Sequence, residues 1–163
     1  MKKFTVVSAL LCIVILLFAS GCQKQSAPTD LDIKAVASAV INSGAYTDSM
    51  GEAKTETALT LYKLDKADIA DCDVYFSSMA TAEECAVFKA AGKDAAARIL
   101  EACKTRQASQ LTAYENYVPT EVAKINAAII TQAGDYVFYI VSNDQAKVSS
   151  VLSGCGVTVS AAK

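Results

Sequence analysis

The stretch NAAIITQAGDYVFYIVS, residues 126–142, contains two β-rich runs separated by a glycine and an aspartate. Glycine supplies the positive φ that a tight two-residue turn needs, so Gly134 and Asp135 predict a β-hairpin. This turn fixes the register, and the expected cross-strand pairs are Ala133–Tyr136, Thr131–Phe138 and Ile129–Ile140.

Both faces of this hairpin are apolar. One face carries Ile129, Phe138 and Ile140, and the other carries Ile130, Val137, Tyr139 and Val141. We expect one face to pack against a long helix. The other face is either covered by the helices that precede the sheet or exposed as a binding surface.

Hydrophobic spacing predicts the other elements. Two helices are expected before the sheet, the first beginning near Thr29, with Asp32 three residues later, and the second covering residues 55–64. Two strands lie within residues 72–90, close enough to form a hairpin. Later helices are expected at 92–116, at 120–125, and after a cap at Ser142 or Asn143 up to Gly154.

The long helix has an expected inward stripe. Its members are Ala96, Leu100, Cys103, Gln107, Leu111 and Tyr114. The element order predicts an α+β domain, with an antiparallel sheet of two hairpins packed with the long helix and preceded by two N-terminal helices. We expect a single domain over residues 30–155 and a C-terminal tail over 156–163.

The N-terminus has the three parts of a secretory signal peptide. Lys2 and Lys3 precede an apolar core over residues 6–18, which is shorter than the roughly 20 residues of a membrane-spanning helix. Small residues then lead to Cys22. Residues 1–21 therefore predict the signal peptide of an exported protein, with a permanent N-terminal membrane anchor as the alternative.

The tetrapeptide Ala19-Ser20-Gly21-Cys22 resembles the lipobox of bacterial lipoproteins, in which the cysteine thiol is joined to a diacylglycerol. It departs from the usual pattern at Ala19, where leucine is commoner. The resemblance implies lipidation of Cys22 and a location on the extracytoplasmic face of the cell membrane. Two acyl chains anchor a protein stably, and the polar residues 22–29 are the expected spacer between lipid and domain.

The composition excludes several chemistries. The chain has no histidine, and therefore no Ser-His-Asp or Cys-His nucleophile and no His-ligated zinc. Its formal net charge is −2, and the basic residues are scattered rather than clustered as nucleic-acid binding requires. We expect no catalytic residues, no cofactor, no metal site and no nucleic-acid partner.

Four cysteines lie outside the signal peptide and the lipidation site: Cys72, Cys85, Cys103 and Cys155. Four cysteines allow three pairings, and the sequence does not choose among them. Cys85 alternates with apolar strand residues and Cys103 lies on the inward stripe, which favours buried thiols over a structural disulfide.

The segments ATAEECAVFKA (residues 80–90) and YENYVPTEVAKINAAIITQAGDYVFYIVS (residues 114–142), with the helix between them, resemble a family of lipoproteins from Gram-positive bacteria. It is domain-of-unknown-function family 4358, and the resemblance spans roughly residues 31–153. Aliphatic residues are usual in this family where the chain has Cys85, which agrees with a buried thiol. The resemblance implies fold and location, and it brings no catalytic residues.

We expect a non-catalytic module that binds a partner protein, an envelope component or a small ligand at the membrane. The candidate contacts are Tyr75, Tyr117 and Tyr139, and the expected partner is a membrane or cell-wall protein. A purely structural accessory lipoprotein is one alternative.

The other alternative is a carboxylate-dependent cell-wall hydrolase. The candidate acid pairs are Glu83 with Glu84 and Asp71 with Asp73. Adjacent strand residues point to opposite faces, so Glu83 and Glu84 cannot share a site, whereas Asp71 and Asp73 can share a face. A hydrolase would need such a pair beside a deep cleft.

Overall fold

The computed structural model describes residues 30–159. The predicted signal peptide, the lipidation site at Cys22, the spacer over 22–29 and the last four residues of the predicted tail lie outside the described residues. In chain order the elements are α1 (Ile33–Ile41), β1 (Gly51–Glu52), α2 (Thr55–Tyr62), η1 (Lys66–Asp68), β2 (Ile69–Phe76), β3 (Glu84–Ala90), α3 (Lys93–Tyr117), η2 (Pro119–Glu121), α4 (Val122–Asn126), β4 (Ile129–Ala133), β5 (Tyr136–Val141) and α5 (Gln145–Gly154).

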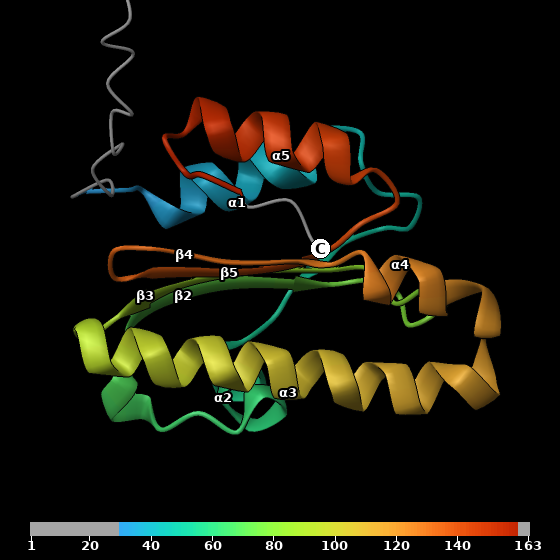
Figure 1. Cartoon of the computed structure of the whole chain (residues 1–163), viewed down its shortest axis with the longest axis horizontal. Helices are drawn as coiled ribbons and strands as arrows, with labels where there is room; N and C mark the ends of the chain where they lie inside the picture. Colours follow the sequence, from blue (N-terminus) through green and yellow to red (C-terminus); the bar gives the residue numbers. More distant parts are fainter. Residues whose placement is uncertain (1–29, 160–163) are drawn as a thin grey trace, which may run out of the picture.

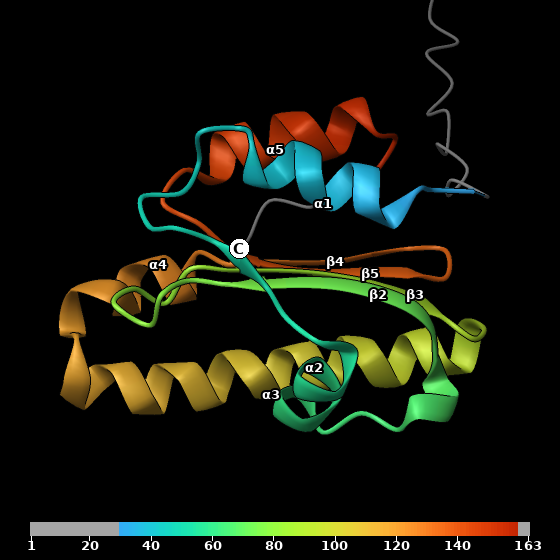
Figure 2. The same cartoon turned by 180° about the vertical axis from the view of Figure 1, so that it is seen from behind.

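The fold has three layers, and its middle layer is one antiparallel sheet (Figure 1). The strand order is β1-β2-β3-β5-β4, with α1 and α5 on one face and α2 and α3 on the other (Figure 2). The predicted α+β class is confirmed. The strand β1 was not predicted, because a strand of two residues has no hydrophobic periodicity.

The turn at Gly134 forms as predicted, with the glycine at φ 61°. The strands β4 and β5 pair in the predicted register, with Ala133 opposite Tyr136 and Thr131 opposite Phe138. The side chains of the hairpin divide between two buried clusters, one under α2 and α3 and the other under α1 and α5. Each hairpin side chain therefore lies on the face of the sheet that the alternating sequence pattern predicts.

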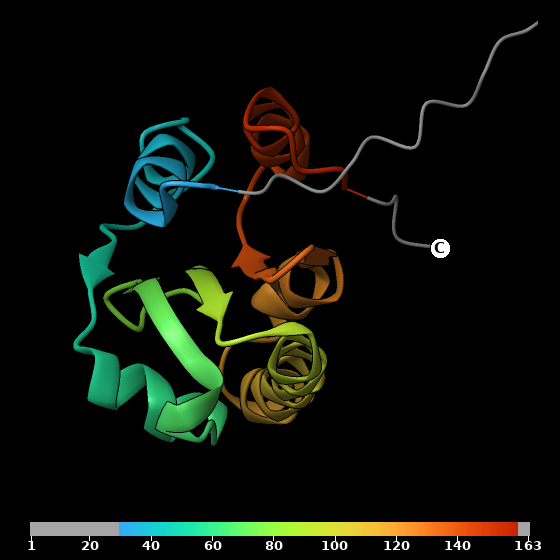
Figure 3. The ribbon, with the colours of Figure 1, turned by 90° about the vertical axis from the view of Figure 1, so that its left-hand side faces the viewer.

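No face of the hairpin is left exposed. The face opposite α3 is covered by α1 together with the C-terminal helix α5, and these two helices lie side by side above the sheet (Figure 3). The helix α2 packs with α3 on the other face. We expected the two helices that precede the sheet to cover this face. This was wrong for α2, which lies on the other face. The alternative, an exposed face, is also wrong.

Aspartates cap two of the helices. The Asp32 carboxylate accepts hydrogen bonds from the backbone N–H groups of Lys34 and Ala35, at 3.1 and 3.0 Å, so α1 begins after Asp32 rather than after Thr29. Likewise Asp144, rather than Ser142 or Asn143, caps α5. An aspartate at the N-cap accepts hydrogen bonds from the otherwise free N–H groups of the first turn.

The buried side of α3 agrees with the predicted stripe in part. Its buried residues are Ala95, Ala96, Ile99, Cys103 and Gln110, of which Ala96 and Cys103 were predicted. Leu100, Leu111 and Tyr114 are partly buried against the same cluster, and Gln107 is also partly buried. Within residues 30–159 no helix combines the length and the apolar character needed to cross a membrane.

Candidate functional site

The three candidate tyrosines do not form one surface. Tyr139 is fully buried under α3, and its hydroxyl donates a hydrogen bond to the side-chain oxygen of Gln110. Tyr75 is half-buried beside the cluster under α1 and α5. Tyr117 is 74% exposed at the end of α3. Burial removes Tyr139 from any exposed binding surface, and Tyr75 and Tyr117 belong to different parts of the domain.

The acid pair proposed for a hydrolase is also divided. Asp73 is buried and Asp71 is exposed. Burial raises the pKa of Asp73, and the nearby carboxylate of Glu52 raises it further. Only Asp71 lines a cavity, a small one of about 280 Å³ beside Cys72. The two carboxylates therefore do not face one deep cleft.

The most elaborate polar cluster surrounds Glu84 at the start of β3. Its carboxylate accepts hydrogen bonds from the Tyr62 hydroxyl at 2.5 Å and from the Gln110 amide at 2.8 Å. The guanidinium of Arg106 donates to the same carboxylate, with Nη2 2.8 Å and Nε 3.2 Å from Oε2. One carboxylate thus joins α2 and α3 to the sheet.

Burial dominates the electrostatics of Glu84. The side chain is 1% exposed, and burial raises the pKa of this carboxyl although Arg106, Tyr62 and Gln110 act in the opposite direction. Neither Arg106 nor Gln110 was predicted to join this cluster. Polar residues on a helix predict a solvent-facing surface unless a buried partner is known, and the partner lies 22 to 26 residues away.

The neighbouring Glu83 reaches different elements. Its carboxylate accepts hydrogen bonds from the backbone N–H groups of Thr47 and Asp48, at 3.0 and 2.9 Å, and from the Thr47 hydroxyl at 2.8 Å. The Lys124 ammonium of α4 lies 3.1 Å away and also contacts Glu121 at 3.0 Å. The Glu83 and Glu84 carboxylates therefore bind different partners, as alternation along the strand predicts, although both residues border one cavity.

An apolar cavity lies beside the Glu84 cluster. It measures about 550 Å³, and its lining includes Leu61 of α2, Met79 of the β2–β3 loop and Tyr114 of α3. Arg106 and Glu84 lie in its wall with their charges paired. The cavity therefore offers mostly apolar contact, with a neutral charge pair at its inner side.

Exposed apolar side chains collect around this cavity. Among residues 30–159 the large exposed ones are Leu61 (41%), Met79 (78%) and Tyr117 (74%). The first two line the cavity, and the ring of Tyr117 packs edge-on against Tyr114, with centroids 6.4 Å apart. Met79 has φ 73°, which is uncommon for a residue with a side chain.

The loop that carries Met79 is tied down at Thr81. The Ser77 and Tyr114 hydroxyls both donate to the Thr81 carbonyl oxygen, each at 2.7 Å. The backbone N–H of Ala82 donates to Glu121 at 2.9 Å. These bonds hold Met79 outward at the mouth of the cavity.

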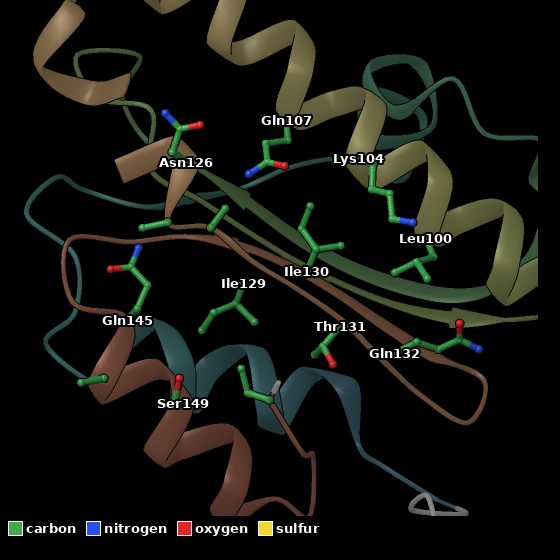
Figure 4. Close-up of a pocket in the computed structure, with 14 residues that line it drawn as sticks. Leu100, Lys104, Gln107, Asn126, Ile129, Ile130, Thr131, Gln132, Gln145 and Ser149 are labelled. Carbon is green, nitrogen blue, oxygen red and sulfur yellow. The ribbon is translucent and has the colours of Figure 1, made fainter. Parts of the chain in front are cut away.

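A second, more polar groove runs along the outer edge of β4. It measures about 840 Å³ and lies between α3 and α5, with the end of α4 closing one side (Figure 4). Its lining includes carboxamide residues from three helices: Gln107, Asn126 and Gln145. The Gln107 amide donates to the Ile125 carbonyl at 2.8 Å, which fixes the inner wall.

All four cysteines of the domain are free thiols. Cys85 and Cys103 are fully buried, as predicted, and they lie in different clusters on opposite faces of the sheet. Burial raises the pKa of the Cys85 thiol to about 12. In the part of the chain described by the structure, no three acidic or thiol side chains approach one another as metal ligands.

These features define a class: a single-sheet α+β domain, helices on both faces, with an apolar cavity at one end and a polar groove along an open strand edge. The family profile that matches residues 42–142 is described as Domain of unknown function (DUF4358). The match covers more than half of the 163 residues, and the chain belongs to this family. No match was found among curated proteins or among solved structures.

Proposed function

We propose that this chain is a lipoprotein of the Gram-positive type, exported by residues 1–21 and anchored to the extracytoplasmic face of the membrane by a diacylglycerol on Cys22. The domain is a non-catalytic module that binds a membrane or cell-wall protein. The support for anchoring is the lipobox after a signal-like apolar run.

One observation carries the binding role. Two of the three large apolar side chains that residues 30–159 expose, Leu61 and Met79, line one cavity of about 550 Å³. The third, Tyr117, packs against Tyr114 in the cavity lining. Clustered exposed apolar surface marks interaction sites, whereas scattered apolar side chains do not. Because Tyr117 extends the apolar surface beyond the cavity, the site suits an apolar side chain of a partner protein rather than a small ligand enclosed in the cavity.

The site also faces away from the proposed anchor. The described chain begins beside the β4–β5 turn, where the Leu31 N–H donates to the Tyr136 hydroxyl at 2.9 Å. The helix α3 begins near the same end and has 25 residues, so Tyr117 lies roughly 37 Å along its axis (Figure 1). A domain tethered at its α1 end would present the apolar cavity to the cell envelope.

The charged side chains support a binding role over a hydrolytic one. Glu83 and Glu84 are fully engaged with donors from the protein itself, and Asp71 and Asp73 do not converge on a cleft. Carboxylate catalysis needs two acids facing the substrate. An accessory lipoprotein with no partner is the competing proposal, and the second experiment below separates the two.

The first experiment tests the anchor. The full chain should label with radioactive palmitate and enter the detergent phase of a Triton X-114 extraction, whereas the Cys22→Ser variant should do neither. Cys72→Ser is the matched control, because it removes a different thiol and should keep both properties. Labelling that survives Cys22→Ser would overturn lipidation at this residue.

The second experiment tests the cavity. A photoreactive p-benzoylphenylalanine replaces Met79 in the full chain in living cells, and cross-linked products are identified by mass spectrometry. Ala113 is exposed and lines the cavity, so Ala113→Trp should fill the cavity and abolish the product. Thr112→Trp is the control, since Thr112 is exposed on the same helix outside the cavity lining.

A cross-link to one envelope protein that persists with Thr112→Trp and disappears with Ala113→Trp supports the proposal. A product insensitive to Ala113→Trp, or no product, overturns it and favours the accessory role.

A further inference from the structure

Among residues 30–159, the outer edge of β4 has no strand partner. There β4 pairs with β5 alone, and its two-residue turn makes Ala133–Tyr136 a hydrogen-bonded pair. Hydrogen-bonded pairs then recur at every second residue, so Thr131 bonds inward. The N–H and C=O groups of Ile130 and Gln132 point away from β5, and within residues 30–159 neither has a backbone partner.

Nothing in the strand itself blocks this edge. Natural sheets protect their edges with lysine, proline, bulges or very short strands. β4 has the sequence IITQA, five residues with regular pairing to β5. The opposite edge of the sheet, β1, has only two residues. Within residues 30–159 the sheet is therefore protected at the β1 edge and unpaired at the β4 edge.

The groove along β4 has the shape of a slot for one strand. The edge of β4 forms its floor, and α3 and α5 stand on either side (Figure 4). On the α3 side it presents Leu100, Lys104 and the side chain of Ile130, and on the α5 side it presents Gln145 and Ser149. The end of the described chain also borders the groove, because Val159 is part of its lining and the Thr131 hydroxyl donates to the Thr158 carbonyl oxygen at 3.2 Å. Alternate side chains of an added strand would thus meet one wall that carries Lys104 and another that carries small or uncharged polar groups.

The charge of the groove indicates the chemistry of its occupant. Among the described residues, Lys104 is the charged member of the lining and no carboxylate borders the groove, although the chain has 17 acidic residues. The Lys104 ammonium contacts Glu101 at 2.6 Å on the exposed side of α3, where the pair is weak and can be exchanged. Lys104 stands on the same wall as Leu100.

We propose that β4 accepts an extended segment of another protein as a sixth strand, by β-strand addition. The segment carries apolar and acidic side chains on the positions that face α3, and small polar side chains on the positions that face α5. The N–H and C=O groups of Ile130 and Gln132 supply the main-chain hydrogen bonds, and Lys104 selects the acidic residue. This site is separate from the apolar cavity and does not rest on the function proposed there.

The probe is a blocked heptapeptide of sequence TVTETVT, which presents valine, glutamate and valine on one side in either chain direction. The measurement is amide hydrogen exchange by NMR on the full-length Cys22→Ser chain. In the free protein the Ile130 and Gln132 amides should exchange quickly, while those of Thr131 and Ala133 are protected. The peptide should slow exchange at Ile130 and Gln132 alone, and TVTKTVT should bind at least about ten-fold more weakly.

A proline at an edge position removes an outward N–H without breaking the ladder. Gln132→Pro should lower the affinity for TVTETVT about ten-fold, whereas the matched variant Gln132→Thr keeps the N–H and should keep the affinity. The native amide protection of Phe138 and Ile140 reports that each variant is folded. Ala113→Trp should leave peptide binding unchanged, which separates this site from the cavity.

Four results would overturn the proposal. Protection of Ile130 and Gln132 in the free protein at every concentration would mean that the chain covers its own edge. Protection that grows with protein concentration would assign the edge to a second copy. Equal binding of both peptides, or no protection at millimolar TVTETVT, would remove the acidic strand as the occupant.

Discussion

Glu83 and Glu84 are adjacent in the chain and both buried, yet the protein holds them in different ways. Glu83 is held mainly by backbone N–H groups of Thr47 and Asp48. Glu84 is held by side chains, with Arg106 as the sole cation in contact among the described residues. The backbone donors to Glu83 are fixed by the conformation of the loop that contains Thr47 and Asp48. The side-chain donors to Glu84 must instead be positioned by the packing of α2 and α3.

The pKa directions follow this difference. Burial raises the pKa of Glu83, but the hydrogen bonds from Asp48, Thr47 and Lys124 outweigh it, and the pKa of Glu83 lies below its ordinary value. Burial also raises the pKa of Glu84, and there it outweighs the effect of Arg106. Several backbone donors therefore stabilise a buried carboxylate better than one paired cation in a deeper position.

The largest effect should come from breaking the Glu84 pair. Arg106→Met leaves a buried carboxylate without its cation, and the free energy of unfolding should fall by about 3–5 kcal/mol. Urea denaturation measures the loss. The double variant Glu84→Met with Arg106→Met removes both charges and should recover much of it, because apolar replacement of a whole buried pair is often tolerated. A loss under about 1 kcal/mol would mean that Arg106 is dispensable.

Glu83→Gln should have the next largest effect. An amide nitrogen cannot accept from the Thr47 and Asp48 N–H groups, so one buried donor loses its partner. The expected loss is about 2 kcal/mol, within the range for hydrogen bonds to charged groups. The same denaturation measurement checks it, with the exposed Glu115→Gln as the matched control. A loss equal to that of the control would contradict the anchoring role of Glu83.

The stability effects of replacing the two glutamates should change in opposite directions when the pH falls. A lowered folded-state pKa gives stability that is full above the unfolded value, about 4.3 for glutamate, and is lost as the pH falls through the folded value. The deficit of Glu83→Gln relative to the native chain should therefore shrink in acid. For Glu84 the raised pKa means that the charged form costs stability above it, so the deficit of Glu84→Gln should grow in acid.

Urea titrations of both variants between pH 3 and 8 measure these trends. Deficits that move in the same direction for the two variants would contradict the assignment of opposite shifts.

The sequence could predict features that depend on local interactions, but not those that depend on side chains far apart in the chain. The β4–β5 register follows from a two-residue turn and strict alternation, both of which are local. The inward side of α3 was predicted from the spacing of its apolar residues. This prediction left out Gln110 and Arg106, which turn inward because they bind the buried Glu84 carboxylate on β3. That attraction depends on which strand lies under the helix, and spacing along the helix does not contain it.

The candidate sites were limited for the same reason. Glu83 and Glu84 were correctly separated, since alternation along a strand is local. Tyr139 was proposed as a surface contact because the pattern could not show that both faces of the hairpin are covered, one of them by α5 from the far end of the chain. Leu61 and Met79 carry no signal in the sequence, because their exposure arises from the β2–β3 loop and α2 meeting around a cavity.

The smallest effect should come from the cation beside Glu83. Lys124→Met removes one donor at 3.1 Å, but the Thr47 and Asp48 donors remain, so we expect a loss of about 1 kcal/mol. Lys124→Arg, which keeps the charge, should lose less. Arg106→Met and Lys124→Met are the same kind of change at two buried pairs, and urea denaturation compares them directly. Equal losses would show that opposite charge, rather than the number of backbone donors, holds both glutamates in the ionised form.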